Sequence, residues 1–295
     1  MLINSFLKYL SYEKKSSPHT VAAYLVDLRA FENFCKDNLE IKNIKEIDYV
    51  HIRSWIVSLS EKDNSHRSIN RKISALKSFY KYLIKIHEID KNPLIQHQSL
   101  KIGKKVIVPF SEKEMETVLN SFSGNDFKSV RNKLVVELLY STGMRRAELV
   151  NLLESSIDLS NKTIKILGKR NKERIVPILD SIVESIEDYQ LERVKIPTES
   201  SHFFLTSKGN KIYETLVYRI INDYFSKISS KTKNSPHVIR HSFATHLLNQ
   251  GADLNSVKEL LGHASLASTQ VYTHNSLEKI KEVYNQTHPR SHKSD

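Results

Sequence analysis

The chain has 295 residues, which exceeds the usual size of one hydrophobic core and favours two domains. Its 45 Lys and Arg residues outnumber the 33 Asp and Glu residues, and the net charge of +12 favours nucleic acid over a membrane surface as partner. The sequence contains no signal-peptide pattern, no apolar run long enough to cross a bilayer and only one cysteine, so we expect a cytoplasmic protein without disulfides.

Residues 1–97 are predicted to form a helical domain of four or five helices. The stretch "SPHTVAAYLVDLRAFENFC" places Ser17 as N-cap and Pro18 at the first helical position, and its apolar residues then recur with a period of 3.6 residues. Cys35 falls within this helix and is expected to be a small buried residue. Two further helices are predicted in "DYVHIRSWIVSL" and in "SHRSINRKISALKSFYKYLIKI".

The third of these helices carries a stripe of basic residues beside its apolar face. On a helical wheel, one flank of that face holds Arg67, Arg71, Lys77, Lys81 and Lys85. No acidic residue lies between Asp63 and Glu88, whereas a merely solvated face usually mixes both signs of charge. Each neutralised phosphate of DNA releases a condensed counterion. We therefore predict that Arg67, Arg71, Lys77 and Lys81 contact DNA, with a solvated face as the alternative.

A change of pattern near residues 98–110 predicts an interdomain linker. Helical periodicity lapses in "KNPLIQHQSLKIGKKVIVPF", which contains two prolines, one glycine and no acid. The second domain, 111–295, begins with a capping box formed by Ser111 and Glu114. It is predicted to be mostly helical, with a β-hairpin and basic tip in "NKTIKILGKRNKERIVPI". The expected fold is therefore mainly α, with two domains and a small β element.

The stretch "SPHVIRHSFATH" concentrates histidines on one predicted helix. His237 and His241 are four residues apart, which could suit a metal, but Arg240 projects between them and His246 points to the opposite side. We therefore expect no metal, and we expect His241 and His246 to be structural. His237 lies in the first turn, after Pro236, where helix N–H groups favour an anion, and with Arg240 it could clamp a phosphate oxygen.

This helix and three other segments resemble the tyrosine recombinases of the phage integrase family, Xer type. "HVIRH" and the later "LLGHASLASTQVYTH" resemble the family's H-x-x-R, G-H and tyrosine box. "LLYSTGMRRAEL" is similar to its first arginine box, and "LGKRNKERIVP" resembles the hairpin that carries its catalytic lysine. The N-terminal helices resemble its SAM-like core-binding domain. The matching positions are Arg145, Glu148, Lys169, His237, Arg240, His263 and Tyr272.

The resemblance implies a role for each of these side chains. Arg145 and Arg240 would bind the non-bridging oxygens of a scissile phosphate, which Tyr272 attacks to form a 3′-phosphotyrosyl link. Lys169 would protonate the leaving 5′ oxygen, and His237 would accept a proton. His263 would donate a hydrogen bond to the phosphate, and Glu148 would orient the site. No metal and no other cofactor is implied.

Two of these assignments have neighbouring alternatives. Arg170 or Lys172 could replace Lys169 as the acid if the hairpin is shifted, because "GKRNK" has arginine where the family often has glycine. Arg146 could replace Arg145, although the "GMR" match favours Arg145.

The resemblance also implies partners and a biological role. The protein would bind double-stranded DNA as a homo-tetramer, or as a hetero-tetramer with a related recombinase, and would resolve chromosome dimers at a short site. A cell-division DNA translocase would be a further partner, and "EVYNQTHPR" resembles the XerC branch more than the XerD branch. The alternatives are a transposon or phage integrase with the same chemistry, a type IB topoisomerase, and a DNA-binding protein of the same fold without activity.

Overall fold

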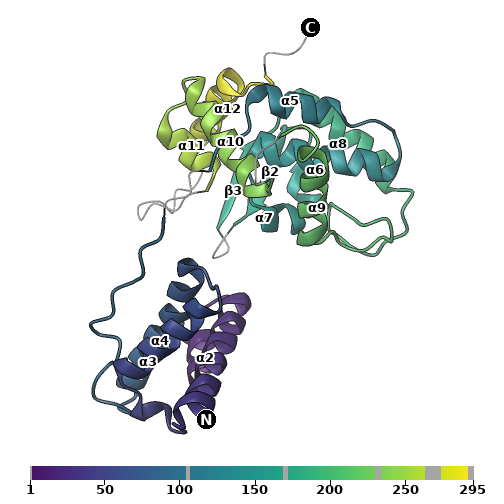
Figure 1. Cartoon of the computed structure of the whole chain (residues 1–295). Coiled ribbons are helices and arrows are strands. Elements are labelled where there is room, and N and C mark those ends of the chain that lie inside the picture. Colours follow the sequence, from purple (N-terminus) through teal and green to yellow (C-terminus); the bar gives the residue numbers. More distant parts are fainter. Residues whose placement is uncertain (1, 104–106, 169–171, 230–233, 263–273, 292–295) are drawn as a thin grey trace. The chain divides into compact units, whose positions relative to one another are not determined.

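The computed structural model describes residues 2–103, 107–168, 172–229, 234–262 and 274–291, with side chains left out for 274–280. The chain divides into two compact units, Met1–Lys105 and Val106–Asp295, which are treated separately below (Figure 1). Both units are mainly helical, and the second also contains a small antiparallel sheet, so the predicted fold class is confirmed. Among the helices of the described residues, none combines the length and the apolar character needed to cross a bilayer.

The first unit is a helical domain packed around aromatic side chains. Ser17 caps the second helix as predicted, because its side chain accepts a hydrogen bond from the Thr20 backbone N–H. Phe31 and Trp55 lie in the core with ring centroids 4.9 Å apart, and Cys35 is buried as expected. The elements of this unit are α1 (Leu2–Tyr12), α2 (Pro18–Leu39), the 3-10 turn η1 (Ile44–Glu46), α3 (Tyr49–Glu61) and α4 (His66–Lys85).

The basic flank of α4 has two kinds of residue. Arg67, Lys77 and Lys81 are exposed, as a surface for DNA requires. Arg71 instead forms a two-pronged ion pair with Asp27 of α2, whose side chain is fully buried, and Lys72 pairs with the same carboxylate at 3.1 Å. The guanidinium of Arg71 therefore holds two helices together, although half of its side chain remains exposed.

The two ends of the predicted linker are each attached to a different unit. The Asn70 side chain forms two hydrogen bonds of 2.9 Å with the backbone N–H and C=O of Leu100, and the Lys101 carbonyl lies 2.7 Å from His66 Nδ1. At the other end, the Phe110 N–H donates to Ser242 Oγ at 2.7 Å. The stretch through Lys101 is thus attached to α4, and Phe110 belongs to the second unit.

The second unit is built around one central helix, α6 (Phe127–Thr142). The predicted Ser111–Glu114 capping box and the predicted hairpin both form, the hairpin with Leu167 opposite Glu173. The strands are β1 (Ile157–Asp158), β2 (Thr163–Leu167) and β3 (Glu173–Pro177), in the order β1-β2-β3 after the 3-10 turn η2 (Glu154–Ser156). The helices are α5 (Glu112–Asn120), α6 (Phe127–Thr142), α7 (Arg146–Val150), α8 (Asp180–Arg193), α9 (Glu214–Phe225), α10 (Pro236–Asn249), α11 (Leu254–Leu260) and α12 (His274–Thr287).

The end of the central helix α6 determines where the candidate site forms. Of the 16 residues in α6, 12 are buried, so helices cover it on nearly all sides. It ends at Thr142, and the next residue, Gly143, has a φ of +59°, which favours glycine. A Cβ there would lie 2.4 Å from the Phe243 ring and 2.8 Å from Leu261, so glycine is also needed for close approach. The turn before α7 is thereby held against α10 and the end of α11.

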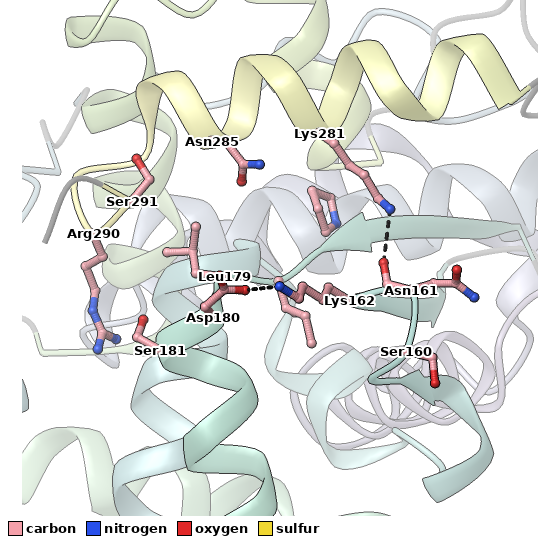
Figure 2. A pocket seen from close by; sticks show the side chains of 12 residues that line it. Ser160, Asn161, Lys162, Leu179, Asp180, Ser181, Lys281, Asn285, Arg290 and Ser291 are labelled. Atoms are coloured by element: carbon pink, nitrogen blue, oxygen red, sulfur yellow. Dashed lines mark hydrogen bonds and ion pairs between the residues drawn. The ribbon is translucent and has the colours of Figure 1, made fainter. Parts of the chain in front are cut away.

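The second half of α12 packs on its own unit. Tyr284 is fully buried, and its hydroxyl donates to the Ser141 carbonyl of α6 at 2.7 Å. Lys281 Nζ donates to the Asn161 carbonyl at 3.0 Å, across a cavity of about 530 Å³ between the sheet, α8 and α12 (Figure 2). Of the predicted site residues that the structure describes, none lines this cavity; Arg145 and Glu148 lie instead at the turn between α6 and α7.

Candidate active site

The turn between α6 and α7 presents Arg145 beside a buried carboxylate. Arg145 is the N-cap residue of α7, and Glu148 lies in the first turn of this helix. Glu148 Oε2 accepts from the Arg145 backbone N–H at 2.7 Å, and its Oε1 accepts from Arg145 Nη1 at 2.8 Å. The Glu148 side chain is 4% exposed and that of Arg145 is 38% exposed. The buried carboxylate of Glu148 therefore holds Arg145 in place, while part of the Arg145 guanidinium stays open to solvent.

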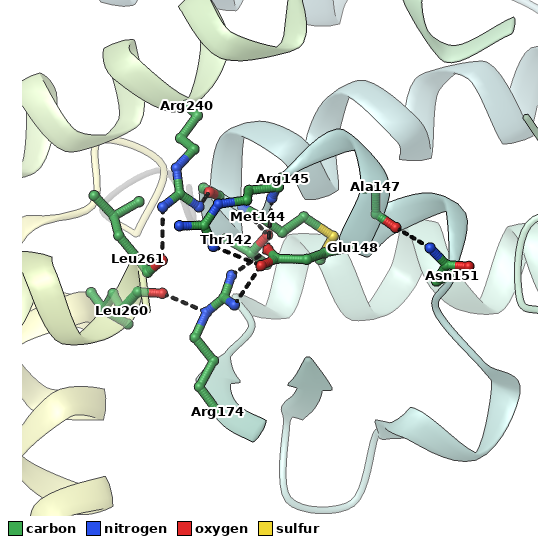
Figure 3. A network of polar contacts seen from close by, with 11 residues as sticks. Thr142, Met144, Arg145, Ala147, Glu148, Asn151, Arg174, Arg240, Leu260 and Leu261 are labelled. Atoms are coloured by element: carbon green, nitrogen blue, oxygen red, sulfur yellow. Dashed lines mark hydrogen bonds and ion pairs between the residues drawn. The ribbon is translucent and has the colours of Figure 1, made fainter. Parts of the chain in front are cut away.

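A second arginine that sequence reasoning missed completes the coordination of this carboxylate. Arg174 of β3 donates to Glu148 from Nη1 at 3.1 Å and from Nη2 at 2.7 Å, and its side chain is 5% exposed (Figure 3). Alternation along β3 could have indicated it, because Arg174 and Val176 share one face of the strand. An arginine on the buried face of a strand requires a buried acceptor.

The two arginines keep Glu148 ionised. Burial alone would raise the pKa of Glu148, but the hydrogen bonds and the charge of Arg174 outweigh it, together with the hydrogen bonds from Arg145. The result is a pKa below the usual value for glutamate. Glu148 is therefore a carboxylate at neutral pH and cannot act there as a proton donor.

Arg240 reaches the same place from α10. Its Nη1 donates to the Gly143 carbonyl at 2.5 Å and its Nη2 to the Leu261 carbonyl at 2.7 Å, so two backbone groups hold the guanidinium plane (Figure 3). Burial, followed by the positive charge of Arg145, lowers the pKa of Arg240 to about 10. It remains protonated at neutral pH. Figure 3 shows the guanidiniums of Arg240 and Arg145 near each other, and an anion bound between them would relieve the repulsion of their like charges.

The histidines of α10 have different surroundings. His237 is the second residue of the helix and is exposed, one turn before Arg240, and Ser235 makes no side-chain hydrogen bond that caps this end. His246 is buried and hydrogen-bonds to the Tyr140 hydroxyl at 2.8 Å, so its predicted structural role is confirmed. His241 is exposed and is therefore not a core histidine.

Three predicted site residues, Lys169, His263 and Tyr272, lie outside the described residues. Of the neighbours considered as alternatives, Arg146 pairs with Glu214 of α9, whereas Arg145 lies in the cluster with Glu148. The structure thus brings together Arg145, Glu148 and Arg240 from the predicted set and adds Arg174. We call these four residues the arginine cluster; three guanidiniums and one carboxylate give it a net charge of +2.

Comparison with known proteins identifies the class. The model of the Phage integrase family matches residues 109–279, and the model of the Phage integrase N-terminal SAM-like domain matches residues 3–87. The chain belongs to the phage integrase family, which confirms the resemblance seen in its motifs.

Individual proteins that are similar to this chain indicate one branch of that family. The chain is 36% identical to tyrosine recombinase XerC of Chlorobaculum parvum, covering 97% of this chain and 94% of that protein. It is 39% identical to tyrosine recombinase XerC of Anoxybacillus flavithermus, covering 98% of each. Among solved structures, the XerH site-specific recombinase bound to palindromic difH substrate in a post-cleavage complex matches with a TM-score of 0.72 and 25% identity, covering 95% of this chain and 83% of that one.

Proposed function

We propose that this chain is a site-specific DNA recombinase that cuts and rejoins strands through a 3′-phosphotyrosyl intermediate and resolves chromosome dimers at a short site. The observation that carries the proposal is the arginine cluster, in a chain that is 36–39% identical to XerC proteins over almost its whole length. Arg145 and Arg240 provide two guanidiniums that are held by hydrogen bonds and only partly buried, and they can hold the two non-bridging oxygens of a phosphodiester.

Besides these two guanidiniums, the proposed chemistry needs a nucleophile, groups that transfer protons and a further hydrogen-bond donor to the phosphate. A phenol with a pKa near 10 is a weak nucleophile at neutral pH, and the nearby guanidiniums lower the cost of forming the phenolate of Tyr272. Lys169 would protonate the leaving 5′ oxygen, while His237 would accept a proton and His263 would donate to the phosphate. The covalent link retains the energy of the broken bond, so the proposed reaction requires no ATP.

The proposed assembly follows from the family. Four protomers, identical or paired with a related recombinase, would act on two DNA duplexes in the cytoplasm, with a cell-division DNA translocase as a further partner. The match to XerH bound to difH substrate supports DNA as the partner of this fold. The net charge of +12 supports it independently, because a basic surface attracts a polyanion of any sequence.

Supercoiled plasmids with and without a pair of recombination sites test the proposal, the site being mapped first with nicked suicide substrates. We expect covalent adducts and recombinant circles only with the paired sites. Relaxation that does not depend on the site would support a type IB topoisomerase. Binding without any adduct would support a non-catalytic DNA-binding protein. Strand exchange between unlike sites, with none between paired identical sites, would support an integrase of transposon or phage type.

The basic flank of α4 gives a separate prediction for the first unit. Lys77→Ala and Lys81→Ala should each weaken DNA binding and reduce the slope of log K against log salt by about 1, because each removes one phosphate contact. Arg71→Ala is the matched comparison, since it leaves buried Asp27 with Lys72 alone and should lower the thermal unfolding midpoint, which the two lysine variants should not change. Slopes unchanged in both lysine variants would remove Lys77 and Lys81 from the DNA interface.

A further inference from the structure

Arg174 joins three segments that are far apart in the sequence. Its backbone belongs to β3, and its Nη1 and Nη2 atoms hold Glu148 at the start of α7. Its Nε donates to the Leu260 carbonyl at the end of α11, at 2.9 Å. Every nitrogen of the guanidinium therefore has an acceptor within the protein, and the side chain is almost fully buried. Arg174 cannot contact DNA directly, so any role in the reaction must act through the groups that it holds.

Two glycines show how closely this side chain is packed. A Cβ at Gly262, where φ is +62°, would lie 3.0 Å from Arg174 Cδ and 3.2 Å from its Nη1. A Cβ at Gly168 would lie 3.5 Å from Glu148 Oε1 and 3.7 Å from Arg174 Nη1. In the sequence, Gly168 is followed directly by Lys169, and Gly262 is followed directly by His263. The Arg174–Glu148 pair therefore lies against the chain just before two of the residues to which the proposed function gives chemical roles.

Arg174 is linked to the proposed cleavage reaction because it shares the negative charge of Glu148 with Arg145. A carboxylate paired only with Arg145 would cancel the charge of that arginine and weaken its attraction for a phosphate. Glu148 accepts from two guanidiniums instead, so its negative charge is divided between Arg145 and Arg174. We infer that Arg174 is a positioning residue for DNA cleavage: by sharing the charge of Glu148 it leaves the Arg145 guanidinium, still bonded to Glu148, with more of its positive charge available to the scissile phosphate. This inference rests on the proposed function.

The net charge of the arginine cluster matches the transition state better than the ground state. A phosphodiester carries one negative charge, and attack by a phenolate brings a second one onto the phosphoryl oxygens and the bridging atoms. A cluster of net charge +2 complements that dianion, and preorganised charge of this kind acts mainly on the chemical step. Loss of Arg174 would reduce the net charge to +1 without removing any atom that touches DNA.

Two variants, Arg174→Met and Arg174→Met/Glu148→Gln, test whether Arg174 acts by sharing the charge of Glu148. Arg174→Met should slow formation of the covalent adduct on a suicide substrate by about 100-fold, with DNA affinity changed by no more than about threefold. Glu148→Gln in addition removes the charge that Arg174 offsets, so the net charge returns to +2. The Arg174→Met/Glu148→Gln variant should therefore cleave at least tenfold faster than Arg174→Met alone. A role limited to packing and to the hydrogen bond with the Leu260 carbonyl, which the second substitution does not restore, predicts a double variant as slow as the single one or slower.

Controls separate folding from charge sharing. Arg193→Met removes another buried arginine, which bonds to Glu154 and to the carbonyls of Phe203 and His202 away from the cluster, and its adduct rate should remain within about threefold of the unchanged protein. If Arg174→Met alone does not fold, the double variant, which contains no unpaired buried carboxylate, provides the test. It should cleave within about tenfold of the unchanged protein, and a folded double variant that cleaves at the rate of Tyr272→Phe would overturn the inference.

The outcomes also separate this inference from the proposed function. If the unchanged protein forms no adduct that Tyr272→Phe lacks, the proposed function fails. If that difference is present but Arg174→Met cleaves as fast as Arg193→Met, the recombinase assignment stands and charge sharing by Arg174 is wrong.

Discussion

Replacing Tyr272 with phenylalanine is expected to abolish the covalent DNA adduct while leaving DNA affinity within about twofold of the unchanged protein. The substitution removes one oxygen, and that oxygen is the proposed nucleophile, so no alternative route to a phosphotyrosyl bond remains. The proposed DNA contacts are made by the basic residues of α4 and by the guanidiniums of Arg145 and Arg240, which the substitution does not alter. Denaturing electrophoresis of labelled suicide substrate measures the adduct, and a gel-shift titration measures the affinity.

Tyr218→Phe is a matched control for this variant. Tyr218 is a half-exposed tyrosine of α9, so the control makes the same atomic change at a tyrosine outside the arginine cluster. Its adduct yield should equal that of the unchanged protein. An adduct that persists in Tyr272→Phe would show that another residue is the nucleophile, and mapping the DNA-linked peptide by mass spectrometry would identify it.

Local sequence was enough to predict the elements of this fold. Ser17 and Ser111 begin helices because their side chains accept hydrogen bonds from N–H groups three residues further on, a relation contained within one turn. The hairpin was predictable for the same reason, since alternation in β2 and β3 and a polar turn lie within one short stretch. Arg145 and Glu148 were identified from motifs, whereas Arg240 also followed from its position one turn after His237 near the start of a predicted helix.

The features that sequence reasoning missed all depend on contacts between distant residues. The helix α4 carries no acid of its own, so the pairing of Arg71 with Asp27 is visible only once α2 lies beside α4. Arg174 is separated from Glu148 by 26 positions and from Leu260 by 86, and no local pattern specifies such partners. The carbonyl acceptors of Arg240 belong to Gly143 and Leu261, backbone groups that every residue type carries, and sequence therefore gives no signal for them.

Replacing Lys169 with alanine is expected to slow cleavage of ordinary DNA by 10²–10⁴-fold, the usual contribution of a general acid. Breaking the phosphorus–oxygen bond generates a 5′ alkoxide, which is a very poor leaving group unless it is protonated as it departs. A substrate with sulfur at the 5′ bridging position leaves as a thiolate, which needs no proton. With that substrate the Lys169→Ala variant should cleave within about tenfold of the unchanged protein.

Arg240→Ala is the control for rescue by sulfur, because the proposed role of Arg240 is to bind non-bridging oxygens and not the leaving oxygen. Arg240 is held by the Gly143 and Leu261 carbonyls in a position to bind non-bridging oxygens in the proposed complex, so Arg240→Ala should stay slow with both substrates. A Lys169→Ala variant that sulfur does not rescue would move the acid to Lys172 or Arg170, and the same pair of rates for Lys172→Ala and Arg170→Ala would show which one. If sulfur rescued Arg240→Ala equally well, the assay would be reporting only a weaker bond, and it would assign no proton donor at all.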